Sequence, residues 1–324
     1  GILRVNGDAA LGSTTTLAAA GSHLAGPADV RLRGGYLSVT NGFTTARQFI
    51  LSTNSNGGID VAANQTLTLT TATAGAFGIR KVGPGTLALN NAANTITVLT
   101  LGGGQQLNSN TGYYSHTGGT VSTTATSGSP FATSNAILNS GTLSLVGGAV
   151  AQALSIPTIT YGAAGQIALS AGATSSQLTA ATALTRAGLF NTVNYGTLTI
   201  NPSSLINLGS TEKVLVTAGA PANTALTGGD ILTVPSIFIA LASSSQDANF
   251  ARYDAVNGLM EHSVTTIGTL AVTAAANVGD IIAVDVAGAG VIDIAALRTS
   301  ANITPTDGTT LLQINRGGLI INGG

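Results

Sequence analysis

Apolar and polar positions alternate in short stretches that begin with glycine and recur along the chain. The pattern is Gly-x-(Leu/Ile)-x-(Val/Leu/Ile), and it starts at Gly1, Gly35, Gly57, Gly85, Gly141, Gly165, Gly196, Gly268, Gly290 and Gly317, with QTLTL at Gln65 as a copy without the glycine. Most successive copies start 22 to 34 residues apart. An apolar pair with a period of two predicts a short strand with one buried face, and a preceding glycine permits a tight corner.

A strand of this length cannot bury its apolar face alone, so the repetition predicts units stacked in parallel around one continuous core. We therefore expect an all-β protein with the architecture of a parallel β-helix. A β-sandwich is the alternative, because regular short strands with turn signals suit it as well. The stretch TSSQLTAATALTRAGL from Thr174 is the nearest to a helical pattern, as one short turn.

The rhythm of the repeats divides the chain into three parts. Residues 1–185 and 266–324 carry the repeats, whereas residues 186–265 form a divergent excursion or insertion, with its most irregular part around 190–265. The excursion contains Pro202, Pro221 and Pro235 and the most apolar run of the chain, ILTVPSIFIALA from Ile231. Because the motif resumes at Gly268, we expect one continuous domain that is a segment of a longer chain or of a polymer.

The composition narrows the range of functions. Only 7% of the 324 residues are charged, the net charge is -1, and the 104 positions from Val82 to Thr185 contain no Asp, Glu, Lys or Arg. These features disfavour nucleic acid as a partner and leave that third of the chain almost no groups for acid–base or metal chemistry. The chain has no cysteine, so it has neither a disulfide framework nor a thiolate zinc site. Every apolar run is too short for a membrane-spanning helix.

One stretch of the repeats resembles a known family. Lys81-Val82-Gly83-Pro84-Gly85-Thr86-Leu87-Ala88-Leu89, continuing to Asn94-Thr95, is similar to the autotransporter-associated β-strand repeat. GDAALGS at Gly7, GGYLSVTNGFTTARQFIL from Gly34 and GGIDVAANQTLTLT from Gly57 resemble the segments that precede that core, and Phe250 to Ala255 resemble the Phe-x-x-Tyr-Asp-Ala core of a divergent segment.

The resemblance implies an exported, surface-exposed, right-handed parallel β-helix that acts as a structural or adhesive stalk. The family has no catalytic residues to transfer to this chain. The full Lys-x-Gly-x-Gly-Thr-Leu core occurs once, and a C-terminal translocator barrel is not part of the sequence.

The glycines between Gly83 and Gly104 do not form a phosphate-binding loop, because neither Gly-Lys-Ser/Thr nor Gly-x-Gly-x-x-Gly before a helix occurs there. A calcium-binding nonapeptide is absent as well, since Gly102-Gly103-Gly104 is followed by Gln105-Gln106. His23, His116 and His262 are far apart in sequence, so a metal site or a catalytic triad among them is disfavoured. We expect no cofactor and no bound metal.

A polysaccharide-cleaving or polysaccharide-binding β-helix of the tailspike or lyase type is the alternative function, and it would need carboxylates from neighbouring strands. The candidates are Asp280, Asp285, Asp293 and Asp307, of which Asp285 and Asp293 are the weak catalytic candidates. The apolar alternation predicts that both point outward, as Asp60 does in GGIDV, where solvated strand residues are the simpler interpretation. Tyr113 and Tyr114 are candidate glycan-contact aromatics.

The preferred hypothesis is a non-catalytic structural segment of an exported bacterial surface protein: a β-helical stalk, adhesin, or subunit of a filament or surface layer. Both GILRVNG at the start and GGLIINGG at the end have the sequence of a repeat unit. Exposed edges of this kind add strands, so we expect copies of the chain or neighbouring repeats as partners, with surface glycans as a further partner class. The expected location is extracellular, on the bacterial outer surface.

Overall fold

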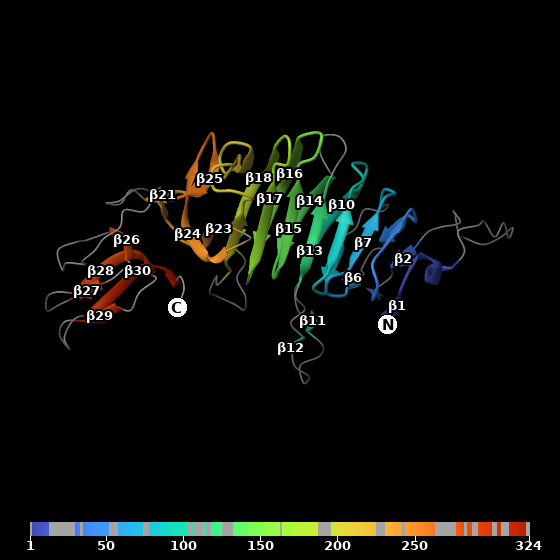
Figure 1. The fold of residues 1–324 in the computed structure, drawn as a ribbon, viewed down its shortest axis with the longest axis horizontal. Coiled ribbons are helices and arrows are strands. Elements are labelled where there is room, and N and C mark those ends of the chain that lie inside the picture. The colour runs from blue at the N-terminus through green and yellow to red at the C-terminus, as the bar shows by residue number, and fades with distance from the viewer. Residues whose placement is uncertain are drawn as a thin grey trace. The chain divides into compact units, whose positions relative to one another are not determined.

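A computed structural model describes most of the chain (Figure 1). The described residues are 2–12, 30–32, 35–51, 58–73, 78–102, 105–106, 113–114, 118–124, 132–162, 164–186, 196–224, 231–241, 244–262, 277–281, 284–286, 291–299, 303–305 and 311–321. The chain divides into two compact units, one made of residues 1–197 and 216–219 and the other of residues 198–215 and 220–324. Both units are built from strands, which confirms the all-β prediction.

The first unit contains two long parallel sheets. One has the strand order β1 (Ile2–Val5), β3 (Tyr36–Val39), β6 (Gly58–Val61), β8 (Ile79–Val82), β10 (Thr95–Leu101), β14 (Ala132–Leu138), β16 (Gln152–Tyr161) and β18 (Ser176–Arg186). The other has the order β4 (Phe43–Thr45), β7 (Thr66–Leu69), β9 (Thr86–Leu89), β13 (Gly119–Thr123), β15 (Gly141–Val146) and β17 (Gly165–Ser170). From β3 to β18 the chain alternates between these sheets, and each new strand is added next to its predecessor.

Smaller elements complete the first unit. They are the 3₁₀ helix η1 (Asp8–Leu11), the parallel pair β2 (Val30–Leu32) and β5 (Phe49–Leu51), and the antiparallel pair β11 (Gln105–Gln106) and β12 (Tyr113–Tyr114). The described residues of the stretch from Thr174, which came closest to a helical pattern, are not helical. Its residues form β18, which pairs with β16 along almost its whole length, because tertiary pairing outweighs a weak local preference.

Residues at equivalent positions of successive strands form buried ladders. In the first sheet one ladder consists of Leu37, Ile59, Lys81, Leu101, Leu138 and Tyr161. In the second sheet a ladder consists of Leu67, Leu87, Val121, Leu143 and Ile167. All of these side chains are 4% exposed or less. Because alternate residues point to one face, the period-two pattern of the sequence places each apolar pair in the core.

The second unit mixes parallel and antiparallel pairs. β19 (Leu198–Asn201) pairs in parallel with β23 (Ile237–Leu241), which continues through antiparallel pairs to β24 (Ser244–Asp254) and β25 (Gly258–Glu261). The remaining strands are β20 (Glu212–Val216), the antiparallel pair β21 (Asn223–Thr224) and β22 (Ile231–Leu232), the parallel set β26 (Asn277–Ile281), β28 (Val291–Thr299) and β30 (Leu311–Ile321), and the parallel pair β27 (Val284–Val286) and β29 (Ile303–Pro305). Ile231, Phe250, Ala296 and Ile320 form a core cluster of this unit.

Hydrogen bonds link the connection after one strand to the equivalent connection of the preceding repeat. The hydroxyls of Thr40, Thr70 and Thr71 donate to the backbone carbonyls of Val5, Thr45 and Ala46 at 2.6–3.1 Å. Backbone N–H groups do the same, for example from Thr70 to the carbonyl of Thr45. At these connections neutral threonine hydroxyls, and not charged side chains, satisfy backbone carbonyls.

Candidate functional site

Two buried cations connect neighbouring segments in the first unit. Arg47 is 4% exposed and Lys81 is fully buried, although long cationic side chains are rarely buried without partners. Each reaches across from its own connection to backbone carbonyls of another segment. Arg47 and Lys81, each with its hydrogen-bond partners, form two centres that together make up the candidate functional site of the first unit.

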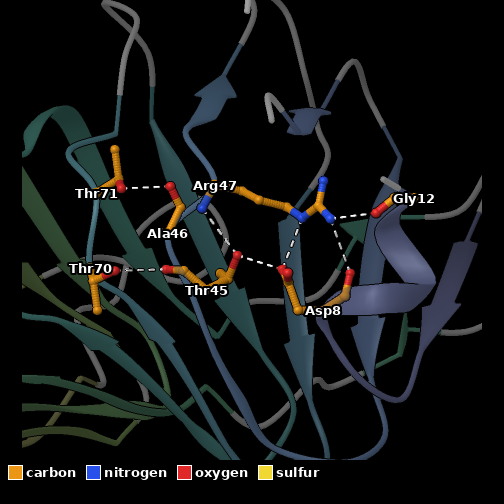
Figure 2. Close-up of polar contacts among 7 residues, drawn as sticks. All are labelled: Asp8, Gly12, Thr45, Ala46, Arg47, Thr70 and Thr71. Carbon is orange, nitrogen blue, oxygen red and sulfur yellow. Dashed lines mark hydrogen bonds and ion pairs between the residues drawn. The ribbon is translucent and has the colours of Figure 1, made fainter. Parts of the chain in front are cut away.

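Arg47 binds η1 to the connection after β4 (Figure 2). Its Nε donates to Oδ1 of Asp8 at 2.9 Å, and its Nη2 donates to the carbonyls of Asp8 and Gly12 at 3.3 and 2.5 Å. The Thr45 hydroxyl also donates to Oδ1 of Asp8, at 2.6 Å, and accepts from the backbone N–H of Arg47. One guanidinium thus satisfies a carboxylate and two carbonyls of the same 3₁₀ turn.

The hydrogen bond from Thr45, together with Arg47, lowers the pKa of Asp8, although burial acts in the opposite direction. A lowered pKa means that this carboxylate stabilises the fold above its unfolded pKa, and that the contribution is lost as the pH falls through the folded value.

We expect Asp8→Asn to lower the free energy of unfolding by about 1 kcal/mol at neutral pH, because Asp8 is partly exposed to solvent. The variant should also lose less stability than the parent protein below about pH 4, where the parent's carboxylate becomes protonated. Urea unfolding from pH 7 to pH 3 measures both effects. Equal stability of the two proteins at pH 7, or an equal loss of stability of both between pH 7 and pH 3, would contradict the role of Asp8.

Lys81 lies at the corner where the chain passes from β8 to β9. Its side chain occupies a core position, with Ile59 and Leu101 as its ladder neighbours. Its Nζ donates to the carbonyls of Val82 and Gly83 at 2.6 and 2.8 Å, and to that of Gly118 on the next connection at 3.5 Å. An ammonium has three donors and no acceptor, so this set of carbonyls matches it.

Burial lowers the pKa of Lys81 to about 8, and the carboxylate of Asp60 acts in the opposite direction. The glycines around the amine make room for this arrangement. Gly83 has a positive φ of 77°, and a side chain there would meet Oδ1 of Asp60. Gly119 has a positive φ of 55° and lies directly against the carbonyls of Gly83 and Gly85. The sequence KVGPGTL therefore forms a corner in which the buried ammonium of Lys81 donates hydrogen bonds to the backbone carbonyls.

The second unit contains a comparable centre with the opposite charge. Glu212 is fully buried, and its carboxylate accepts from both the backbone N–H and the hydroxyl of Ser203. Asn207 donates its side-chain amide to the same hydroxyl. The carboxylate therefore organises the turn between β19 and β20 from inside.

The two weak catalytic candidates, Asp285 and Asp293, fall on different sheets, whereas Asp280 and Asp293 lie on the paired strands β26 and β28 of one sheet. Asp285 lies in β27 and pairs with Thr304 of β29, whereas Asp293 lies in β28 and pairs with Gln313 of β30. Asp280 pairs with Arg298. Asp307 lies outside the described residues. Asp60 is on the outward side of β6, as predicted, next to the fully buried Ile59 and Val61.

The other predicted positions remain separate from these centres. Tyr113 and Tyr114 form β12 and pair with Gln106 and Gln105, and their role in glycan contact stays a prediction. His262 is buried, and its backbone N–H donates to the Phe250 carbonyl; His23 and His116 lie outside the described residues. The described residues contain no group of three or more His, Asp or Glu placed to hold a metal ion. Among them there is also no helix with the length and apolarity to cross a membrane.

Sequence reasoning missed Arg47, Lys81 and Glu212 as structural centres. A signal for Lys81 was present, because it occupies the inward position of the period-two pattern in GIRKV, two residues after Ile79. No comparable signal marked Arg47 or Glu212.

Comparisons with known proteins add no relative to this description. No protein-family model, no curated protein and no solved structure matches the chain.

Proposed function

We propose that this chain is a non-catalytic structural segment of an exported bacterial surface protein, folded as a right-handed parallel β-helix and used as a stalk, adhesin, or subunit of a filament or surface layer. The observation that supports this most is the alternation of the chain between two parallel sheets, with each pass adding one strand to each sheet. We call one such pass a rung. Each rung packs against the rung before it, so additional rungs lengthen the protein without a separate hydrophobic core.

The bonds between rungs suit a mechanical role. Inter-strand hydrogen bonds, threonine hydroxyls and the two buried cations all connect one rung with another. Unfolding one rung would therefore require breaking its bonds to both neighbours. The resemblance of Lys81–Leu89 to the autotransporter-associated repeat supports the assignment to the cell surface. The hydrogen bonds of Lys81 to backbone carbonyls fit a structural role for this residue and not a catalytic one.

The proposal predicts that a complete rung can be removed. Thr142 and Gln166 are register partners, so deleting residues 142–165 joins Gly141 to Gln166 with inward and outward positions preserved. We expect the shortened protein to remain folded, with a cooperative thermal transition and a β-type circular dichroism spectrum at a moderately lower midpoint.

The matched control removes only residues 142–153, which deletes β15 but leaves β16 to follow β14 directly. β14 and β16 belong to the same sheet, so after this deletion the chain passes from β14 to β16 without contributing a strand to the other sheet. We therefore expect aggregation and no cooperative transition. If the complete-rung deletion behaved as badly as the half-rung deletion, the repeats would not be interchangeable units and the proposal would fail.

A further inference from the structure

Two neighbouring side chains inside the first unit carry polar atoms that have no protein partner. Thr73 is 4% exposed and Asn94 is 1% exposed. Within the described part of the chain, Oγ1 of Thr73 and Nδ2 of Asn94 make no hydrogen bond, although both atoms are closed off from solvent. A buried hydroxyl or amide without a partner destabilises a fold, and nearly all such groups in folded proteins are paired with protein or with ordered water.

The two unpaired atoms lie on either side of one hydrogen bond between connections. The backbone N–H of Thr73 donates to Oδ1 of Asn94 at 2.7 Å, so the amide is oriented with Nδ2 as its free donor group. Nδ2 of Asn91 donates in the same way to the carbonyl of Thr70, at 2.9 Å. Both bonds span 21 positions, so the connection after β9 is stacked in register on the connection after β7, and Thr73 and Asn94 are held next to each other.

The chemistry of these atoms restricts what can bind to them. Nδ2 of Asn94 only donates, so its partner must be an acceptor, which excludes a metal cation. The hydroxyl of Thr73 both donates and accepts. An anion would accept from both groups, but both are neutral, and a buried charge is costly without an opposite charge to offset it. Water accepts from the amide and also exchanges a hydrogen bond with the hydroxyl, so it matches both groups without a charge.

We propose that Thr73 and Asn94 bind one internal water molecule, which links the connection after β7 to the connection after β9. Its oxygen accepts from Nδ2 of Asn94, and it exchanges a second hydrogen bond with Oγ1 of Thr73. The water thus adds a link between two rungs beside the direct bond from the Thr73 N–H. Buried waters of this kind make about three hydrogen bonds and are costly to remove, so they are part of the fold.

Thr123 provides an internal comparison. It is fully buried, and its Oγ1 likewise has no hydrogen-bond partner within the described ranges. Its register partner on β15 is Leu145, which is fully buried and aliphatic. A water molecule needs at least two polar partners to stay in a protein interior, so we expect the hydroxyl of Thr123 to be dry. The same substitution at Thr73 and Thr123 should therefore change stability in opposite directions.

Replacing each threonine by valine, which has a similar shape but no hydroxyl, tests the inference. We expect Thr73→Val to lower the midpoint of thermal unfolding by about 2–4 °C, because the water and Nδ2 of Asn94 lose their partners. Thr123→Val is the matched control and should raise the midpoint by about the same amount, because it removes a buried hydroxyl that has no partner. Thr73→Ser keeps the hydroxyl and should keep the water.

A high-resolution crystal structure of the parent protein gives the direct observation. We expect an ordered water within hydrogen-bonding distance of both Oγ1 of Thr73 and Nδ2 of Asn94, present in Thr73→Ser and lost in Thr73→Val. A dry site, an ion at this position, or a direct bond between the two side chains would overturn the inference, as would a Thr73→Val protein as stable as the parent. The rung deletion removes neither residue, so the two proposals can fail separately.

Discussion

Replacing Lys81 by methionine is expected to lower the free energy of unfolding by about 2 kcal/mol at pH 7 and by about 5 kcal/mol near pH 10. Methionine fits the space but cannot donate, so the buried carbonyls of Val82 and Gly83 lose their donor. The loss at pH 7 is reduced because the parent must bury a charged amine there, and this cost disappears when the amine becomes neutral.

The pH dependence follows from the pKa of Lys81. In the folded protein this pKa is about 8, below the ordinary value of 10.5, so between these pH values the unfolded chain binds more protons than the folded one. Parent stability therefore rises with pH across this window, by at most about 3 kcal/mol. Urea unfolding at pH 7 and pH 10 measures the difference in free energy of unfolding between the parent and Lys81→Met. Both proteins contain the same tyrosines, so the ionisation of the tyrosines cancels in this difference.

Arg80→Met is the matched control for Lys81→Met, because Arg80 precedes Lys81 on the same strand and is partly exposed. It should change stability by less than about 1 kcal/mol, with no effect on the pH slope. If the parent and Lys81→Met had the same slope between pH 8 and pH 10, the buried amine would not be titrating as described.

The second large effect is expected from Gly119→Ala, which should destabilise the protein by about 3 kcal/mol or more. Gly119 has a φ of 55°, and its added methyl group would lie against the carbonyls of Gly83 and Gly85 and 2.8 Å from Nζ of Lys81. Backbone carbonyls on the adjacent corner cannot move aside as the end of a flexible side chain can. Thermal or urea unfolding gives the magnitude.

Gly219→Ala separates backbone strain from crowding. Gly219 has a similar φ of 62°, but the nearest atom to an added methyl group is the Thr182 carbonyl oxygen at 3.7 Å. This variant should lose only about 1–2 kcal/mol, the cost of a left-handed conformation for alanine. Equal losses in Gly119→Ala and Gly219→Ala would show that the crowding around Lys81 is unimportant.

The strands were predictable where the apolar alternation is regular. GTLSL at Gly141 and GQIAL at Gly165 are strands with alternate residues buried, because a half-buried strand requires this pattern; GTLAL at Gly85 buries Leu87 and Leu89 as predicted and Ala88 as well. β18 was not predictable from its own residues. SQLTAATALTR combines helix-favouring Ala, Leu, Gln and Arg with β-branched Thr, and its pairing within the sheet, along almost its whole length with β16, makes it a strand.

The candidate site was less accessible from the sequence than the strands. Lys81 was recognised as part of a repeat core, and two of its hydrogen bonds go to the adjacent Val82 and Gly83, but the third, to the carbonyl of Gly118, spans 37 positions of the chain. Arg47 and Asp8 are 39 positions apart, and Arg47 follows β4 by only two residues. A pattern read within a window of ten or twenty residues contains no information on such pairs, since their proximity arises from the stacking of connections.

The sequence by itself determined that this protein is made of short strands with one apolar face, few charges and glycine at the corners, because those properties depend on neighbouring residues and on the period of two. Only the tertiary structure decided which strands are neighbours and that Arg47, Lys81 and Glu212 are buried; the parallel pairs in the two long sheets agree with the stacking that the repeats predicted. Burial of a charge is decided by partners from distant segments, because desolvation is tolerated only where carbonyls, hydroxyls or an opposite charge converge on the group.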